Sequence, residues 1–409
     1  MNQKSKPELL APAGNLETLK IAFAYGANAV YCGTPAFAMR ARVGFDFESL
    51  AEGIEYAHKL KKKVYLTLNA FPHPDVIEEL KKHINKLIAL KPDAFIVADP
   101  GMVDFLVNNY DIPVHLSTQA STTNQLAANF WKKIGVERIV LARELSLDEI
   151  KTISDQSKVE IECFVHGAMC MAYSGRCQIS NYLTGRDPNQ GQCIQACRFK
   201  YKMYALEEDL RKDEYFPIYE DEEGTHILNS KDLCMIENID QMIEAGITSL
   251  KIEGRLKSEY YVATVVRAYR MAIDDYFTDK SLYQQNKSSY LEDIKKTANR
   301  GLTTGFYFNK PDQNTNNYKS SKADSTWGYI GRVTESHEQE KTMTFICKNY
   351  LEIEDHLEII TPTDTYSLDL TEMSVNGEPV KIAHADNLVT ISFDHKVTTD
   401  TFLRKEIKK

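Results

Sequence analysis

Residues 114–142, VHLSTQASTTNQLAANFWKKIGVERIVLA, contain a strand pattern, a helix pattern and a second strand pattern in that order. Val114–Thr118 and Arg138–Ala142 are short β-rich runs, and Thr123–Ile134 between them has the pattern of a helix. Strands that alternate with helices form βαβ units, in which successive strands lie parallel. This stretch therefore predicts a parallel sheet covered by helices.

The same alternation extends from the start of the chain to about residue 280. It gives eight predicted strands, and their regular spacing of about 20 to 35 residues from the second to the sixth favours a closed (β/α)₈ TIM-barrel-like fold. A doubly wound sheet uses the same pattern and is the alternative. The other predicted strands are Glu8–Ala11, Ala29–Gly33, Lys63–Leu68, Ala94–Ala98, Glu160–Val165 and Ser249–Glu253, and the other helical patterns are Leu16–Tyr25, Phe47–Leu60, Asp75–Leu90 and Leu147–Ser154.

The pattern changes after the barrel, and this change predicts the domains. Residues 1–308 are predicted to form the barrel as the catalytic domain, with a cysteine-rich insertion at about 166–245. Residues 309–325 are polar and indicate a linker. Residues 326–409 alternate in short apolar and polar runs, which predicts a small all-β barrel. This module is either a structural appendage or a docking surface for a macromolecular substrate.

Composition limits the class of protein and its partners. The 409 residues are 43% hydrophobic and 26% charged, which excludes a disordered or low-complexity chain. No run approaches the ~18 apolar residues of a membrane span, and no apolar signal core precedes the first strand, so a cytoplasmic protein is expected. The net charge of −9 excludes a global basic field, so RNA binding would need a local basic patch.

Polar side chains follow the ends of most predicted strands, which in a barrel lie together at one rim. Helix capping is a plain explanation for the short polar side chains Asn15, Asp99 and Ser146. It explains the cationic ones poorly, because a cationic side chain does not accept a hydrogen bond from the first turn of a helix. The catalytic candidates at the strand ends are Arg143, His166, Glu253 and Arg255.

Five of the eight cysteines fall between residues 163 and 197. In a chain of this size without need of disulfides, such a cluster indicates a metal site or a catalytic one. Thiolates at four positions suit either tetrahedral zinc or a [4Fe–4S] cluster. Only the last two have the tight spacing of a zinc knuckle, which favours the larger cluster; zinc and free buried cysteines are the alternatives. The predicted ligands are Cys170, Cys177, Cys193 and Cys197, with Gly167, Gly175, Gly185 and Gly191 nearby to let the backbone turn.

The run ECFVHGAMCMAYSGRCQIS at residues 162–180 resembles the signature of the collagenase-like peptidase family of unknown catalytic type, number thirty-two. Further similar blocks bring the resemblance to about residues 8–308. Within the family, FVHGA, MAYS and QCIQACR are most similar to the bacterial tRNA hydroxylation protein P branch. The further blocks are ELLAPAGN at 8–15, RDPNQG at 186–191, NSKDL at 229–233 and KIEGR at 251–255.

That resemblance implies oxygen-independent formation of 5-hydroxyuridine at the wobble position of tRNA, with prephenate as co-substrate. Relatives that hydroxylate ribosomal RNA or ubiquinone precursors share the need for prephenate, and the ubiquinone relatives carry a four-cysteine [4Fe–4S] cluster. The ligand role then falls on the same four cysteines, with Cys234 as a substitute for Cys197. Iron–sulfur assembly proteins are implied partners.

Arginine side chains suit the two carboxylates of prephenate, because a guanidinium binds a carboxylate through two hydrogen bonds. A local basic patch for tRNA is predicted at residues 198–204, where basic and apolar or aromatic side chains alternate; an amphipathic strand that covers the barrel is the alternative. The candidate substrate-binding residues are Arg40, Arg42, Arg176, Arg198, Lys200 and Lys202, with Arg143 and Arg255 as further candidates for the carboxylates.

Two other functions stay open. A peptidase is conceivable with Cys170 and His166 as nucleophile and base, but no third member of a triad is apparent and the H-E-x-x-H motif of zincins is absent. The second alternative is a metal-bearing binding or scaffold protein.

Overall fold

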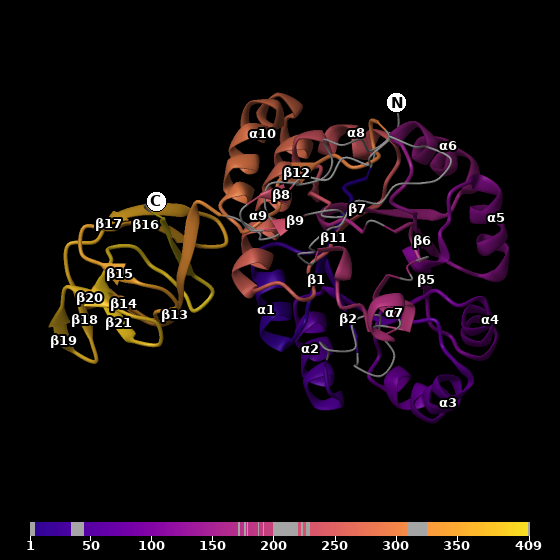
Figure 1. The fold of residues 1–409 in the computed structure, drawn as a ribbon, viewed down its shortest axis with the longest axis horizontal. Coiled ribbons are helices and arrows are strands. Elements are labelled where there is room, and N and C mark those ends of the chain that lie inside the picture. The colour runs from indigo at the N-terminus through magenta and orange to yellow at the C-terminus, as the bar shows by residue number, and fades with distance from the viewer. Residues whose placement is uncertain are drawn as a thin grey trace.

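The computed structural model describes residues 5–33, 45–170, 172–175, 177, 179–186, 188–190, 192–198, 220–221, 224–225, 230–309 and 325–407. Eight of the described strands form a ring in which every neighbouring pair is parallel, and a pairing between β7 and β11 closes it (Figure 1). This confirms the predicted TIM-barrel-like fold. The ring strands are β1 (Glu8–Pro12), β2 (Ala29–Cys32), β3 (Lys63–Leu68), β4 (Ala94–Val97), β5 (Val114–Leu116), β6 (Arg138–Val140), β7 (Glu160–Ala168) and β11 (Ser249–Ile252).

Helices cover the outside of the ring, and most of the apolar core lies between them and the strands. Their apolar residues recur at helical spacing; Leu80, Ile84 and Leu87, for example, are the buried residues of α3. Asn15 and Asp99 cap α1 and α4, and Ser146 forms a capping box in α6, so the plain explanation for these three is correct. The helices are α1 (Leu16–Ala24), α2 (Phe47–Lys59), α3 (Pro74–Ala89), α4 (Pro100–Asn109), α5 (Gln125–Ile134), α6 (Leu147–Ser157), α8 (Ile239–Glu244), α9 (Glu259–Thr278) and α10 (Lys280–Lys295).

The segment between β7 and β11 adds short elements that periodicity did not predict. The end of β7 pairs with the antiparallel strand β10 (Asp232–Cys234), which in turn pairs with β12 (Leu302–Thr303). The short helix α7 (Ile179–Thr184) lies over the ring in Figure 1. Besides α8, the remaining described elements of the segment are the short strands β8 (Glu220–Asp221) and β9 (Gly224–Thr225) and three single-turn 3₁₀ helices, Pro188–Gln190, Ala196–Arg198 and Ile236–Asn238.

Residues 327–406 form a separate domain built on an eight-stranded antiparallel sheet in the order β17-β16-β22-β13-β14-β21-β18-β19. The short alternating runs predicted there form strands, and the domain has an apolar core of its own beside that of the barrel. The strands are β13 (Trp327–His337), β14 (Thr342–Ile346), β15 (Leu351–Glu352), β16 (His356–Ile360), β17 (Thr365–Asp369), β18 (Met373–Val375), β19 (Glu378–Val380), β20 (Ile382–Ala383), β21 (Leu388–Ser392) and β22 (Phe402–Glu406).

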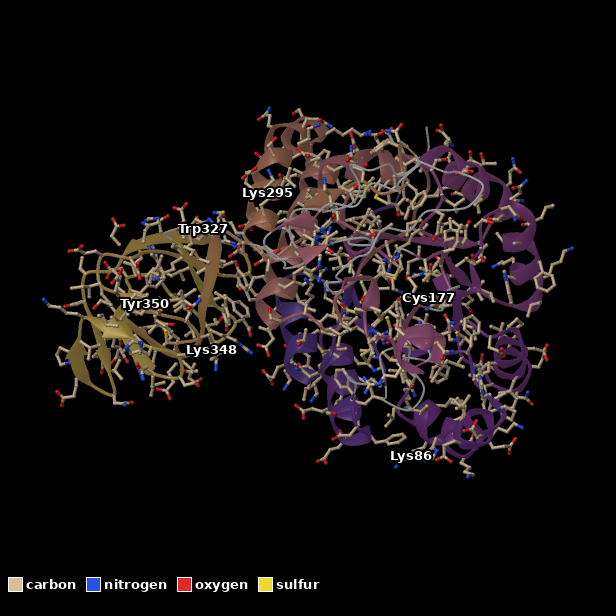
Figure 2. The ribbon with its side chains drawn as sticks, in the orientation of Figure 1. Lys86, Cys177, Lys295, Trp327, Lys348 and Tyr350 are labelled. Carbon is tan, nitrogen blue, oxygen red and sulfur yellow. The ribbon has the colours of Figure 1, made fainter. Side chains whose placement is uncertain are left out.

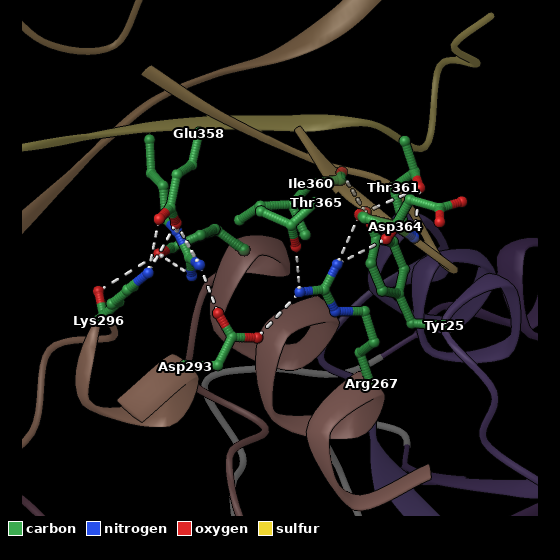
Figure 3. Close-up of polar contacts among 11 residues, drawn as sticks. Tyr25, Arg267, Asp293, Lys296, Glu358, Ile360, Thr361, Asp364 and Thr365 are labelled. Atoms are coloured by element: carbon green, nitrogen blue, oxygen red, sulfur yellow. Dashed lines mark hydrogen bonds and ion pairs between the residues drawn. The ribbon is translucent and has the colours of Figure 1, made fainter. Parts of the chain in front are cut away.

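Buried charged side chains join this domain to the barrel through ion pairs and hydrogen bonds (Figure 3). Arg404 on β22 is buried and forms ion pairs with Asp293 on α10 and with Glu358 on β16. Arg267 on α9 donates hydrogen bonds to Asp293 and to the carbonyl oxygens of Thr361 and Asp364. The Arg404 side chain therefore belongs to the interface between the two domains.

Candidate functional site

A cavity opens at the carboxyl ends of the ring strands and is lined by residues of these ends and of the segment after β7. Strand ends supply Thr67, Asn69, Ser117, Arg143 and Glu253 to its wall, and all four predicted cysteine ligands line the same space. These residues are spread over positions 67–253 of the sequence, and the closed ring brings them to one place. Figure 2 shows Cys177 over the middle of the barrel.

Three contacts hold the cysteine-bearing segment against the rim. The backbone N–H and hydroxyl of Ser174 both donate to the Glu144 carboxylate, at 2.9 Å each. The backbone N–H of Phe71 donates to the carbonyl oxygen of Asn189 at 3.1 Å. Gly175 has a φ of +72°, and a Cβ atom there would lie only 2.2 Å from the Gln119 carbonyl oxygen. The segment is thus fixed to the loops after β3, β5 and β6.

The four cysteines differ in exposure but share one environment. Cys170 is exposed, and the other three are partly buried. Burial raises the pKa of the Cys177 thiol, and the nearby Cys193 and Cys170 add to this effect. The backbone N–H of Gln195 approaches the Cys193 sulfur at 3.4 Å, a contact that stabilises a thiolate.

The chemistry of these four donors fits an iron–sulfur cluster. Four sulfur donors are the usual ligands of such a cluster. Among the residues that the structure describes, no three His, Cys, Asp or Glu side chains lie as close together as the ligands of one metal ion.

Cys234 lies elsewhere. It is buried on β10 and does not line the cavity; its sulfur accepts a hydrogen bond from the Tyr269 hydroxyl at 4.0 Å. Burial raises the pKa of the Cys234 thiol to about 11. This position gives no support to the hypothesis that Cys234 replaces Cys197.

Two of the predicted catalytic cations do reach the cavity. Arg143 donates to the carbonyl oxygen of Ala168 at 2.6 Å, and Arg255 donates to the Thr67 hydroxyl at 3.0 Å. Glu253 also lines the cavity, where its carboxylate accepts from the Tyr31 hydroxyl at 3.3 Å. These three residues come from the ends of β6 and β11.

His166 does not reach the cavity. Its ring is 3% exposed and packs against Tyr261 and Tyr269, with Nδ1 3.4 Å from the Tyr269 hydroxyl. Burial, together with the positive charge of Lys257, lowers the pKa of His166 to about 3. The ring is therefore neutral and enclosed, and this geometry gives no support to its predicted catalytic role.

The structure adds a cavity-lining cation that sequence reasoning missed. Lys251 on β11 is 4% exposed, and its Nζ lies 2.7 Å from the carboxylate of Glu162, which is fully buried inside the barrel. Arg138 contacts the same carboxylate at 3.3 Å. Although burial alone would raise the pKa of Glu162, the two cations lower it to about 2. The sequence signal for this buried pair was a charged residue inside each of two largely apolar strands, Glu162 in β7 and Lys251 in β11.

The other predicted substrate-binding residues cannot be placed. Arg198 ends a short 3₁₀ turn (Ala196–Arg198), and its side chain is outside the described part. Arg40, Arg42, Arg176, Lys200 and Lys202 also lie outside the described residues, so their roles stay predictions.

These features agree with the comparisons with known proteins. The chain belongs to Peptidase family U32: the family model matches residues 14–317, and the model of the Peptidase family U32 C-terminal domain matches residues 325–404. The tRNA hydroxylation protein P of Escherichia coli (strain K12) is 38% identical over 93% of this chain and 92% of its own length.

Two further relatives carry related names. The tRNA hydroxylation protein P1 of Bacillus subtilis (strain 168) is 38% identical over 98% of this chain and 95% of its own length. The 23S rRNA 5-hydroxycytidine C2501 synthase of Escherichia coli (strain K12) is 36% identical over 73% of this chain and 45% of its own length. In the described part of the chain, we find no helix with the length and apolar character of a membrane span.

Proposed function

We propose that this chain is an iron–sulfur tRNA-modifying enzyme. It supports the prephenate-dependent, oxygen-independent hydroxylation of the wobble uridine of tRNA to 5-hydroxyuridine. One observation carries the proposal: four cysteines and three cations face a single cavity at the catalytic rim of a barrel. The names of the relatives point to RNA hydroxylation, in tRNA for two of them and in ribosomal RNA for the third.

In this proposal Cys170, Cys177, Cys193 and Cys197 hold a [4Fe–4S] cluster. When bound, such a cluster supplies redox or Lewis-acid chemistry at the cavity. The chain itself positions the thiolates by fixing their segment to Glu144, and the Gln195 N–H donates to the Cys193 sulfur. Because burial raises the pKa of Cys177, cluster binding must release a proton there and becomes weaker at low pH.

For modification, the target base of the RNA must leave the base stack and enter the cavity. Cationic side chains outside the cavity would bind the neighbouring phosphates. Arg198, Lys200 and Lys202 are our candidates for those phosphate contacts. Changing Lys200 and Lys202 to Glu should weaken tRNA binding and flatten its salt dependence, since each phosphate contact adds ~0.7 to 0.9 to the slope. The proposal also implies a cytoplasmic location and contact with iron–sulfur assembly proteins.

Mass spectrometry of tRNA nucleosides tests this function directly. A strain that lacks the gene should lose 5-hydroxyuridine and its derivatives, and the wild-type gene should restore them. Anaerobically purified protein should contain iron and sulfide and should be coloured. Unchanged nucleosides in the deletion strain would reject the proposal.

The geometry does not favour the peptidase alternative. A cysteine peptidase needs a histidine beside its nucleophile. The His166 ring contacts Tyr269 behind the strand, and none of the described residues that line the cavity is a histidine. Gelatin cleavage by colourless protein would nevertheless revive that hypothesis, and colour without either activity would favour a scaffold.

A further inference from the structure

One aromatic side chain of the cavity wall is open to solvent. Tyr173 lines the cavity and is 50% exposed, whereas the two other described aromatic rings of the wall, Tyr31 and Phe164, are buried. Other large apolar side chains are exposed in the described part of the chain, but none of them lines this cavity. A single exposed aromatic ring needs no explanation on a protein surface. At the edge of the candidate site, however, it is available to a ligand that enters the cavity.

The backbone that carries the Tyr173 ring is fixed to the barrel. The next residue, Ser174, donates its N–H and its hydroxyl to the Glu144 carboxylate. Gly175 follows with a φ of +72°, and it lies so close to the loop after β5 that a Cβ atom would be 2.2 Å from the Gln119 carbonyl oxygen. The ring therefore projects from a fixed point of the rim. A contact group that is held in place before its ligand arrives loses less conformational entropy on binding.

The faces of the three rings differ in what they already contact. The Arg143 guanidinium lies 3.8 Å from the centre of the Phe164 ring, and Lys251 Nζ lies 4.5 Å from that of Tyr31. In the described part of the chain, no residue hydrogen-bonds to the Tyr173 hydroxyl and no ring or cation lies over its face. Tyr173 is therefore the ring of the wall that can accept another flat group.

The charge around Tyr173 favours a neutral ligand over a phosphate. Burial raises the pKa of the Tyr173 hydroxyl, and the carboxylates of Glu144 and Glu149 raise it further, so the phenol is uncharged at neutral pH. The same two carboxylates repel an anion that approaches the ring. A nucleobase is flat and uncharged, and any base can stack on an aromatic side chain. This place on the rim therefore suits a base of the RNA better than its backbone.

We propose that the Tyr173 ring is the platform on which the target uracil stacks when it enters the cavity. The identity of the base rests on the proposed function. Cys170, in the same segment, is exposed and lines the same cavity, so a base on this platform would share the cavity with the candidate cluster ligands. Stacking replaces part of the contact that the base loses when it leaves the RNA stack. The ring binds and orients the base and takes no part in bond formation.

Binding of an anticodon stem-loop RNA to the full-length, anaerobically purified protein tests the platform. Two RNAs are compared, one with uracil at the wobble position and one with an abasic ribose there, so the ratio of their affinities measures the contribution of the base. The variant Tyr173→Leu keeps an apolar side chain but removes the ring, and Tyr173→Phe keeps the ring without the hydroxyl. The matched control is Tyr350→Leu, which removes a 40% exposed aromatic ring from the C-terminal domain (Figure 2).

Wild-type protein should bind the RNA with uracil about five- to 150-fold more tightly than the abasic RNA, the usual range for one stacked base. Tyr173→Leu should lose this preference with its iron content unchanged, whereas Tyr173→Phe and Tyr350→Leu should keep it. The inference is overturned if the wild type binds both RNAs equally or if Tyr173→Leu keeps the preference. It is also overturned if Tyr350→Leu loses the preference, or if Tyr173→Leu loses it only together with its iron, which would indicate a structural role.

Nucleoside analysis separates this inference from the proposed function. A deletion strain that keeps its 5-hydroxyuridine, beside purified protein whose preference for the base depends on the Tyr173 ring, supports the platform and rejects the proposed function. A strain with Tyr173→Leu that makes normal 5-hydroxyuridine, beside an unchanged preference for the base, rejects the platform and leaves the proposed function intact.

Discussion

At the residue scale, the surroundings of individual sulfur atoms decide which cysteines can be ligands. Cys177 lines the cavity near other thiols, whereas Cys234 is enclosed beside Tyr269. Cys177→Ala should therefore abolish the visible absorbance and most of the iron, because the proposed cluster would lose one of its four ligands. Cys234→Ala is the control and should retain both. Iron analysis of the two anaerobically purified variants checks this; equal iron loss in both would show that Cys234 is a ligand after all.

A second residue-scale prediction concerns His166 and acid. Burial lowers its pKa to about 3, whereas a histidine in the unfolded chain has a pKa of ~6.5. Between these two pKa values the unfolded state binds more protons than the folded state. The stability that depends on a neutral His166 is therefore fully present above pH 6.5 and is lost as the pH falls toward 3. The slope is at most ~1.4 kcal/mol per pH unit.

In the variant His166→Gln, the free energy of unfolding should depend less steeply on pH. Iron content and tRNA modification should stay as in the wild type, since the ring lies outside the cavity. Urea unfolding at pH 6.5, 5.8 and 5.0 measures it in a range where most carboxyl groups stay ionised. Burial also lowers the pKa of His115 to about 3, so the free energy of unfolding of the variant should still depend on pH to some extent. An unchanged slope, or loss of modification with normal iron, would contradict this account of His166.

At the scale of elements, the turn that contains Gly175 connects the cysteine segment to the rim. A Cβ atom at this positive-φ position would meet the Gln119 carbonyl oxygen at 2.2 Å, so Gly175→Ala must push the segment away from the loop after β5. Iron content and modification should fall together, while the barrel keeps its circular dichroism. Gly185→Ala is a close control, because Gly185 also has a positive φ but has nothing within 4 Å. That change should cost only the backbone strain of ~1–2 kcal/mol.

The strands of the barrel domain differ in how well the sequence predicts them. The eight ring strands were predictable because each is a short buried run, such as Ala94–Val97, bounded by turns and helices. The strands β10 and β12 were not, since two or three residues carry no periodicity and their pairing depends on the end of β7.

The residues of the candidate site can also be divided into those that the sequence predicted and those that it did not. The four cysteines were found by their clustering, and the structure brings them to the strand ends. The sequence placed His166 at a strand end correctly, but it did not show that the side chain faces the helices instead of the cavity. Lys251 was missed because its burial depends on Glu162, which lies 89 residues away in the chain.

At the scale of the whole molecule, the C-terminal domain is joined to the barrel by more than a covalent connection. The Tyr25 hydroxyl donates to the carbonyl oxygens of Ile360 and Asp400, and the Tyr260 ring stacks on Tyr329 at 5.3 Å. Phe402 belongs to the core of the barrel rather than to that of its own domain. Deleting residues 326–409 would expose these groups, so a truncated protein that fails to bind tRNA would not identify the docking surface.

A single change at the interface is a sharper test of the joined domains. Arg404→Met removes a fully buried cation that pairs with Asp293 and Glu358. The loss should destabilise the folded protein by about 3 kcal/mol, the lower end for a broken buried pair, because Arg267 and Lys296 still contact the two carboxylates. Lys396→Met, which breaks an exposed pair with Glu338, is the control and should change little. Thermal unfolding of the two variants measures this difference.

If the domains unfold as one unit, the melting temperature of the barrel should fall together with that of the C-terminal domain in Arg404→Met. A fall confined to the C-terminal domain would show that the barrel folds independently of it.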